Sequence, residues 1–266
     1  MPKSNRHSSS AMSTDRSGAA RETGFSSRLR TQWAAGLTTL LCTLPFAAMA
    51  AAPACQAISG ASLTPVIELY TSEGCSSCPP ADQWLSGLKR QPVVAEAFHV
   101  AYWDYIGWKD RFAQTAFTAR QKEIAAQNRQ SGIYTPQLVR NGHDWHDYQQ
   151  VTAPQQPARA RISLQRVGET DGFEARVEPL DVQMPWTAYW TVTEDGHSSR
   201  VRAGENAGEF LKHDFVVRQY VPVGQYQGSQ LLKLYALPAQ AEHLRRINLV
   251  VSHPQSSEPL QALSLS

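Results

Sequence analysis

Residues 66–82 read VIELYTSEGCSSCPPAD, and this stretch decides the fold that the sequence predicts. Its first part, 66–70, is a short apolar run between a proline and a Thr-Ser-Glu-Gly turn, which is typical of a buried strand. Cys75 and Cys78 follow directly, and 81–89 carries apolar residues at helical spacing. We therefore expect the two cysteines at a strand-to-helix junction.

The sequence beyond this junction predicts alternating strands and helices, and then strands alone. We expect further strands at 93–103, 133–140 and 143–148, a helix at 112–128, and later strands at 161–167, 173–178, 187–194, 198–202, 215–221, 231–237 and 247–253. Strand, helix, strand, helix and hairpin is the order of an α/β thioredoxin-like domain. The later runs, joined by Asp-Gly turns, indicate an antiparallel β-rich, sandwich-like C-terminal domain.

Composition divides the 266 residues into five parts. We expect a leader at 1–50, an N-terminal tail of the exported part at 51–62, the thioredoxin-like domain at 63–150, a linker at 151–160 and the β-rich domain at 161–266. The leader has basic residues before an apolar stretch that ends in Ala-Met-Ala, which is the layout of a secretory signal peptide. Because a proline interrupts it, that stretch is marginal for crossing a bilayer. Cleavage near Ala50 predicts a periplasmic or secreted protein without a transmembrane anchor.

The net charge excludes one class of partner. Residues 1–50 hold six of the 25 basic and two of the 23 acidic residues, which leaves 19 basic and 21 acidic residues in the exported part. Nucleic-acid binding depends on basic side chains that neutralise phosphates, so we expect no nucleic-acid partner. Protein thiols or disulfides of the cell envelope are the partners that the cysteines indicate. The sequence indicates no oligomeric state.

Cys75 and Cys78 carry the predicted chemistry. Cysteines separated by two residues can close a disulfide, and a helix N-terminus stabilises a thiolate on the first. Cys75 would be the nucleophile and Cys78 the resolving thiol of a thiol-disulfide oxidoreductase that needs no cofactor besides this redox-active disulfide. A purely structural disulfide is the alternative, although so short a loop adds little stability. Cys42 falls in the leader, and Cys55 near the new N-terminus is either lipidated or free.

A metal site is a second interpretation of the same cysteines. Thiolates are soft ligands, and Cys75, Cys78 and His99 could together hold copper or zinc in a metallochaperone-like module. His143 or His146 could take the place of His99 as the nitrogen ligand.

Two further features are candidates for the site. Glu68 is unusual on a central parallel strand, which is normally buried on both faces. It could accept the proton of Cys78 during resolution, or form a salt bridge at the end of the sheet. Trp103, Tyr105 and Trp108 could line a substrate groove, or pack the next helix onto the sheet. A non-catalytic binding protein that uses these aromatic residues is a third interpretation.

Several stretches together carry a resemblance to a known family. They are 66–82 (VIELYTSEGCSSCPPAD), 98–110 (FHVAYWDYIGWKD), 117–121 (FTARQ), 132–137 (GIYTPQ), 204–208 (GENAG) and 213–218. In these stretches the chain resembles the exported, thioredoxin-like family known as domain of unknown function 1223. The resemblance implies a thioredoxin fold facing a β-rich part, and it implies no substrate. An oxidoreductase activity carries over from the wider thioredoxin superfamily by analogy alone.

The resemblance also bears on one proline. It implies that Pro136 occupies the position of the cis-proline that thioredoxin-like proteins set opposite their two cysteines. We therefore expect the Thr135–Pro136 bond to be cis and to lie beside Cys75. The backbone of Thr135 would then be able to pair with a substrate peptide.

Overall fold

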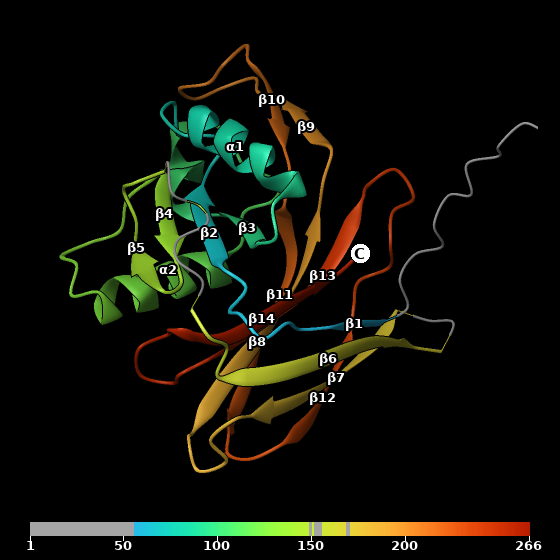
Figure 1. Ribbon diagram of the computed structural model, residues 1–266. Helices are drawn as coiled ribbons and strands as arrows, with labels where there is room; N and C mark the ends of the chain where they lie inside the picture. The colour runs from blue at the N-terminus through green and yellow to red at the C-terminus, as the bar shows by residue number, and fades with distance from the viewer. Residues whose placement is uncertain (1–55, 149–150, 152–155, 169–170) are drawn as a thin grey trace, which may run out of the picture. The chain divides into compact units, whose positions relative to one another are not determined.

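The computed structural model describes residues 56–148, 151, 156–168 and 171–266, all within one compact unit that spans 50–266 (Figure 1). The predicted leader and its cleavage site, Cys42 and Cys55 lie outside the described residues. In the described part, no helix is long and apolar enough to cross a membrane.

Strands predominate over helices among the described residues. The strands are β1 (Gln56–Ile58), β2 (Val66–Thr71), β3 (Val94–His99), β4 (Gln137–Arg140), β5 (His143–Asp144), β6 (Ala160–Val167), β7 (Gly172–Pro179), β8 (Trp186–Glu194), β9 (His197–Arg200), β10 (Phe210–His213), β11 (Val216–Tyr226), β12 (Gln230–Tyr235), β13 (Arg245–Ser252) and β14 (Pro259–Leu265). The α-helices are α1 (Pro79–Ser86) and α2 (Thr115–Gln127), and the 3-10 helices are η1 (Gly87–Arg90) and η2 (Ala101–Ile106).

These strands form three sheets. The largest has the order β14-β13-β8-β11-β3-β2-β4-β5, the second has the order β1-β6-β7-β12, and β9 pairs with β10 in a third. β2 and β3 are parallel, and β4 is antiparallel to β2. β11 joins the other edge of β3 in parallel, with Val216 opposite Ala97, and is antiparallel to β8. The eight-stranded sheet therefore continues from the strands near the cysteines into the C-terminal strands.

The predicted α/β thioredoxin-like fold class is wrong. Most predicted elements exist near their expected positions, but β2, β3 and β4 do not form an α/β sheet of their own. Because β3 takes β11 as a neighbour, they become one end of a mixed, mainly β assembly. Local patterns locate a strand, but they do not say which strand will pair with its free edge.

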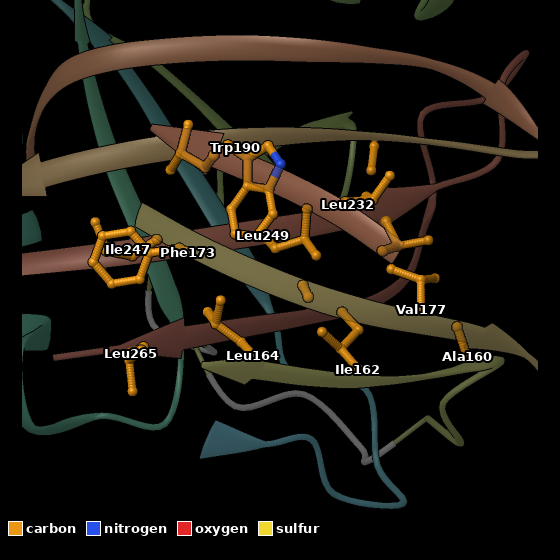
Figure 2. Close-up of a cluster of buried hydrophobic side chains, with 14 of the residues drawn as sticks. Ala160, Ile162, Leu164, Phe173, Val177, Trp190, Leu232, Ile247, Leu249 and Leu265 are labelled. Carbon is orange, nitrogen blue, oxygen red and sulfur yellow. The ribbon is translucent and has the colours of Figure 1, made fainter. Parts of the chain in front are cut away.

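The main core lies between the two large sheets. Alternate residues of β8 and β13 point toward the second sheet, as expected from the two-residue period of a strand. Figure 2 shows Trp190 and Leu249 from the eight-stranded sheet together with Ile162 and Leu164 from β6. Burial of such side chains contributes about 1.5–3 kcal/mol each. This core anchors the C-terminal strands whose connections reach the disulfide.

Smaller cores attach the two helices to the other end of the large sheet. Leu69 of β2 packs with Leu85 of α1, whereas its neighbour Tyr70 packs with Phe117 of α2. Successive strand residues point to opposite faces, so α1 and α2 cover opposite faces of β2. The site described below lies where β2 ends and α1 begins.

Candidate functional site

Cys75 and Cys78 form a disulfide bond in the connection between β2 and α1, as the sequence predicted. Their sulfur atoms are 2.14 Å apart and their Cα atoms 5.4 Å apart. Both cysteines are buried, with exposed fractions of 1% and 0%, whereas Ser76 and Ser77 between them are exposed. The tip of this disulfide loop therefore faces solvent while its sulfur atoms do not.

The helix that follows begins with two prolines. Cys78 is the N-cap residue of α1, and Pro79 and Pro80 are its first two residues. Proline is tolerated there because the first N–H groups of a helix have no partner within the helix. The prolines also remove two N–H groups that could otherwise face an anion. α1 therefore offers a Cys75 thiolate less stabilisation than a helix with free N–H groups.

A loop from the C-terminal half lies against the disulfide loop. We call residues 201–209, which connect β9 to β10, the cover loop. Glu205 Oε2 accepts hydrogen bonds from the backbone N–H of Ser76 at 3.0 Å and from its hydroxyl at 2.8 Å. These two bonds hold the pKa of Glu205 below its usual value. A carboxylate charge therefore lies next to the cysteines.

A second residue of the cover loop holds the backbone of the disulfide loop. The side-chain amide of Asn206 is buried and donates hydrogen bonds to the carbonyl oxygens of Glu73 and Cys75, at 2.9 and 3.0 Å. A buried carbonyl without a partner is costly, so Asn206 has a structural reason to stay in place. The geometry of the disulfide loop therefore depends on a residue that lies 131 positions after Cys75 in the sequence.

Five ionisable side chains are buried close to the disulfide loop. They are Glu73, Asp82, His99, Asp110 and His213. Five separate segments supply them: the turn after β2, the helix α1, the end of β3, the segment before α2 and the end of β10.

Asp110 orients His99 within this cluster. Asp110 Oδ2 is 2.7 Å from His99 Nδ1 and also accepts the N–H of Glu73 at 2.9 Å, while Oδ1 accepts the N–H of Phe112. Burial alone would raise the pKa of Asp110, but His99 and the N–H donors outweigh it and hold that pKa below its usual value. The other ring nitrogen of His99, Nε2, is buried without a hydrogen-bond partner.

His213 lies between two carboxylates. Its Nε2 is 3.3 Å from Glu73 Oε1 and its Nδ1 is 3.5 Å from Asp82 Oδ1, and neither contact is aligned as a hydrogen bond. Burial would lower the pKa of His213, but Asp82 and Glu73 outweigh it and raise that pKa to about 9. The other carboxylate oxygen of Asp82 accepts a hydrogen bond of 2.6 Å from Thr71.

Both of the predicted substrate-binding tryptophans contact this region. Trp103 donates its indole N–H to the hydroxyl of Thr135 at 2.7 Å, and a Cβ on Gly74 would lie 3.1 Å from the Cβ of Trp103. Trp108 donates to Glu73 Oε2 at 2.7 Å. The structure therefore brings Trp103, Trp108 and Thr135 to the disulfide loop or its immediate neighbours.

The remaining predicted residues near this end are Pro136 and Tyr105. The Thr135–Pro136 bond is cis, as predicted. The next residue, Gln137, pairs with Tyr70 near the end of β2, so Pro136 lies at the same end of the strand as the disulfide loop. Tyr105 is 82% exposed.

Glu68 lies on the other face of the sheet from α1. Both of its carboxylate oxygens bind Arg120 of α2 at 2.8 Å, and Tyr70 donates its hydroxyl at 2.7 Å. α1, which begins directly after Cys78, covers the opposite face. Among the contacts of the described residues, none joins Glu68 to a cysteine. No contact therefore supports the predicted role of Glu68 as the proton acceptor for Cys78.

The structure does not bring together the metal ligands that the sequence suggested, which were Cys75, Cys78 and a histidine. The sulfur atoms of Cys75 and Cys78 are bonded to each other, so this state offers no thiolate to an ion beside His99. His143 and His146 are exposed and pair with carboxylates at the surface.

Sequence reasoning missed much of the buried cluster and its cover. The missed residues are Asp82, Asp110, Glu205, Asn206 and His213. All of them lie within the six stretches that carry the family resemblance. Those stretches were the available signal, but a resemblance to a family without a known activity assigns no role to a residue.

Comparison with known proteins identifies the family. The fold is similar to the crystal structure of protein AGR_C_4864 from Agrobacterium tumefaciens, with a TM-score of 0.61, 24% identity, and coverage of 78% of this chain and 96% of that chain. It is also similar to HBP35 of Porphyromonas gingivalis, with a TM-score of 0.54, 13% identity, and coverage of 78% and 76%. No curated protein matches. The model of the family described as protein of unknown function (DUF1223) matches residues 66–252, and the chain belongs to that family.

Proposed function

We propose that the protein is a thiol-disulfide oxidoreductase of the cell envelope that uses Cys75 and Cys78. The observation that carries the proposal is that the disulfide joins residues only three positions apart and cross-links no separate parts of the fold. In the chain-entropy model a four-residue loop contributes about 2 kcal/mol, against about 4.7 kcal/mol for a hundred-residue loop. A role in stability alone is therefore a weak explanation for the pair.

The reaction is an exchange of disulfides. The thiolate of reduced Cys75 attacks a substrate disulfide, forms a mixed disulfide and releases one substrate thiolate. Cys78 then attacks the Cys75 sulfur, releases the second substrate thiol and closes the Cys75–Cys78 bond. The pair loses two electrons and the substrate disulfide gains them. A dithiol donor must reduce the pair again before the next cycle.

We expect movement of the cover loop to give access to the sulfur atoms. The sulfur atoms are buried, but the serines between them are exposed. The cover loop holds this segment through the hydrogen bonds that Glu205 accepts and Asn206 donates. Breaking these few hydrogen bonds would uncover Cys75 without disturbing the main core. A substrate that competes for the N–H of Ser76 would favour this opening.

The local charges favour reduction of substrates over their oxidation. The Glu205 carboxylate beside Ser76 disfavours a nearby thiolate, and Pro79 and Pro80 supply no N–H group to stabilise one. A pair whose thiolate is disfavoured returns readily to the disulfide and passes its electrons on. We therefore expect a strongly reducing couple.

The test is reduction of insulin disulfides by the purified protein with dithiothreitol as the donor, in a Cys42→Ser/Cys55→Ser background that leaves one cysteine pair. We expect the protein to accelerate the reduction, Cys75→Ser to abolish the acceleration, and Cys78→Ser to accumulate mixed disulfides that gel electrophoresis without reductant detects. The proposal is wrong if the protein with both cysteines reduces insulin, and also oxidised glutathione, no faster than the Cys75→Ser variant does.

A further inference from the structure

Three buried side chains near the disulfide loop have the composition of a metal site. One carboxylate oxygen of Asp82 and one ring nitrogen each of His99 and His213 lie within 4.8 Å of one another. All three residues are buried. They come from α1, β3 and β10, so three firmly placed elements hold them together.

His99 supplies an independent observation that points to a ligand. Its side chain is fully buried, and its Nε2 has no hydrogen-bond partner. An unpaired buried nitrogen is costly and uncommon in folded proteins. Its Nδ1 faces Asp110 at 2.7 Å. A histidine that binds a metal through one nitrogen commonly donates the N–H of the other to a carboxylate, which is the arrangement that Asp110 provides.

The other two side chains each have one polar atom that faces the other. His213 Nε2 faces Glu73 at 3.3 Å, while its Nδ1 faces Asp82 Oδ1 at 3.5 Å. Asp82 Oδ2 accepts the hydroxyl of Thr71 at 2.6 Å, which leaves Oδ1 free to bind an ion. Asp82 and His99 thus each have one atom held by a hydrogen bond and another without one, whereas both ring nitrogens of His213 lie near a carboxylate without an aligned hydrogen bond.

We propose that Asp82, His99 and His213 bind a divalent transition-metal ion, for which zinc is the best fit. Two imidazole nitrogens and one carboxylate oxygen are a ligand set that zinc accepts, with a fourth position left for water or another ligand. Zinc bonds of about 2.0–2.2 Å would draw the three ligand atoms closer together. Each side chain would have to move by less than about 1 Å.

Charge and access are compatible with a bound cation. The carboxyl groups of Glu73, Asp82 and Asp110 are buried close together, and His213 lies between two of them. A divalent cation would offset the negative charge of these groups. A pocket of about 400 Å³ between α1 and β10 is lined by Asp82 and His213 and gives an entry path from solvent.

The site is separate from the proposed exchange reaction because no cysteine belongs to it. The experiment is titration of the chelator-treated protein with Co²⁺, followed by Zn²⁺ in competition, with the disulfide intact. We expect one equivalent of Co²⁺ with a visible absorption band and no thiolate charge-transfer band. His99→Gln should weaken binding by about 10-fold or more. The exposed His146→Gln is the matched control and should bind as the unaltered protein does.

The Cys75→Ser/Cys78→Ser variant separates this proposal from the proposed function. We expect it to retain the metal while losing all exchange activity. Absence of stoichiometric binding by the unaltered protein, unchanged binding by His99→Gln, or loss of binding in the double serine variant would each overturn the proposal. If His99→Gln does not fold, the test is anomalous diffraction from crystals of the unaltered protein grown with Zn²⁺. An anomalous peak between Asp82, His99 and His213 upholds the site, and a peak elsewhere or none overturns it.

Discussion

Glu205 accepts two hydrogen bonds from Ser76 across 129 positions of sequence, one from its backbone N–H and one from its hydroxyl. Ser76 lies between the two cysteines, so this single carboxylate both fastens the tip of the disulfide loop and places a negative charge beside it. The two effects can be separated, because glutamine retains the accepting oxygen and removes the charge.

Glu205→Gln should make the disulfide easier to reduce. With the charge removed, a thiolate on Cys75 is less disfavoured, and the equilibrium constant for reduction should rise by about two- to fivefold at low salt. Equilibration with glutathione mixtures measures this constant. Glu209→Gln is the matched control, because Glu209 is an exposed residue of the same loop, and it should leave the constant unchanged. An effect of equal size in both variants would contradict the assignment to Glu205.

Asn206→Ala should open the disulfide loop. The substitution leaves the carbonyl oxygens of Glu73 and Cys75 without their donor, at a cost of about 1–3 kcal/mol in folding free energy. We expect a lower urea midpoint and a several-fold faster reduction of the disulfide by dithiothreitol. If the midpoint falls and the reduction rate does not change, the cover loop does not limit access.

Arg120 and Glu68 should behave as a buried ion pair rather than as part of the exchange site. Arg120→Met leaves the Glu68 carboxylate buried without its cation and should lower the free energy of unfolding by about 3–5 kcal/mol. Glu68→Gln combined with Arg120→Met should recover much of that free energy. Urea denaturation measures both. Glu68→Gln should leave the rate of insulin reduction unchanged, and a slower rate would restore Glu68 as a proton acceptor.

Glu96 should make stability depend on pH. It is buried on β3, where Tyr189 and Thr191 donate hydrogen bonds to it. Burial, and next the charge of Glu68, raise the pKa of Glu96 to about 7. Between the ordinary glutamate pKa of about 4.3 and pH 7, the folded state keeps a proton that the unfolded state has lost. Stability contributed by Glu96 therefore falls as the pH rises through this window and is constant above it.

Glu96→Gln tests that dependence. The glutamine amide stays neutral. The free energy of unfolding of this variant, relative to that of the unaltered protein, should therefore rise by about 1–3 kcal/mol from pH 5 to pH 8. Urea midpoints at the two pH values measure the difference. The exposed Glu178→Gln is the control and should follow the unaltered protein at both. Parallel curves for Glu96→Gln and the unaltered protein would show that Glu96 is ionised throughout.

The sequence predicted local structure better than assembly. The apolar run before Cys75 became β2, and the runs around Asp171-Gly172 became the paired strands β6 and β7, because both signals are confined to a few neighbouring residues. The pairing of Val216 with Ala97 joins distant segments through backbone hydrogen bonds, which any residue type can make. No local pattern reports such a pairing, and the fold class was wrong for that reason.

The candidate site likewise has a part that the sequence predicts and a part that it does not. Cys75 and Cys78 are recognisable because their spacing is short and fixed. Asp82, His99 and His213 have no characteristic spacing, since the fold brings them together from three elements. Glu68 misled the sequence argument because the strand period gives two faces and does not say which helix covers each of them.

The long separation between Ser76 and Glu205 also affects how the protein is made. A chain emerges from the ribosome N-terminus first, so both cysteines are synthesised well before the cover loop. Glu205 and Asn206, which hold the disulfide loop through hydrogen bonds, are therefore missing when that loop is first synthesised. The disulfide loop can therefore take its final geometry only after the C-terminal half of the chain has been made.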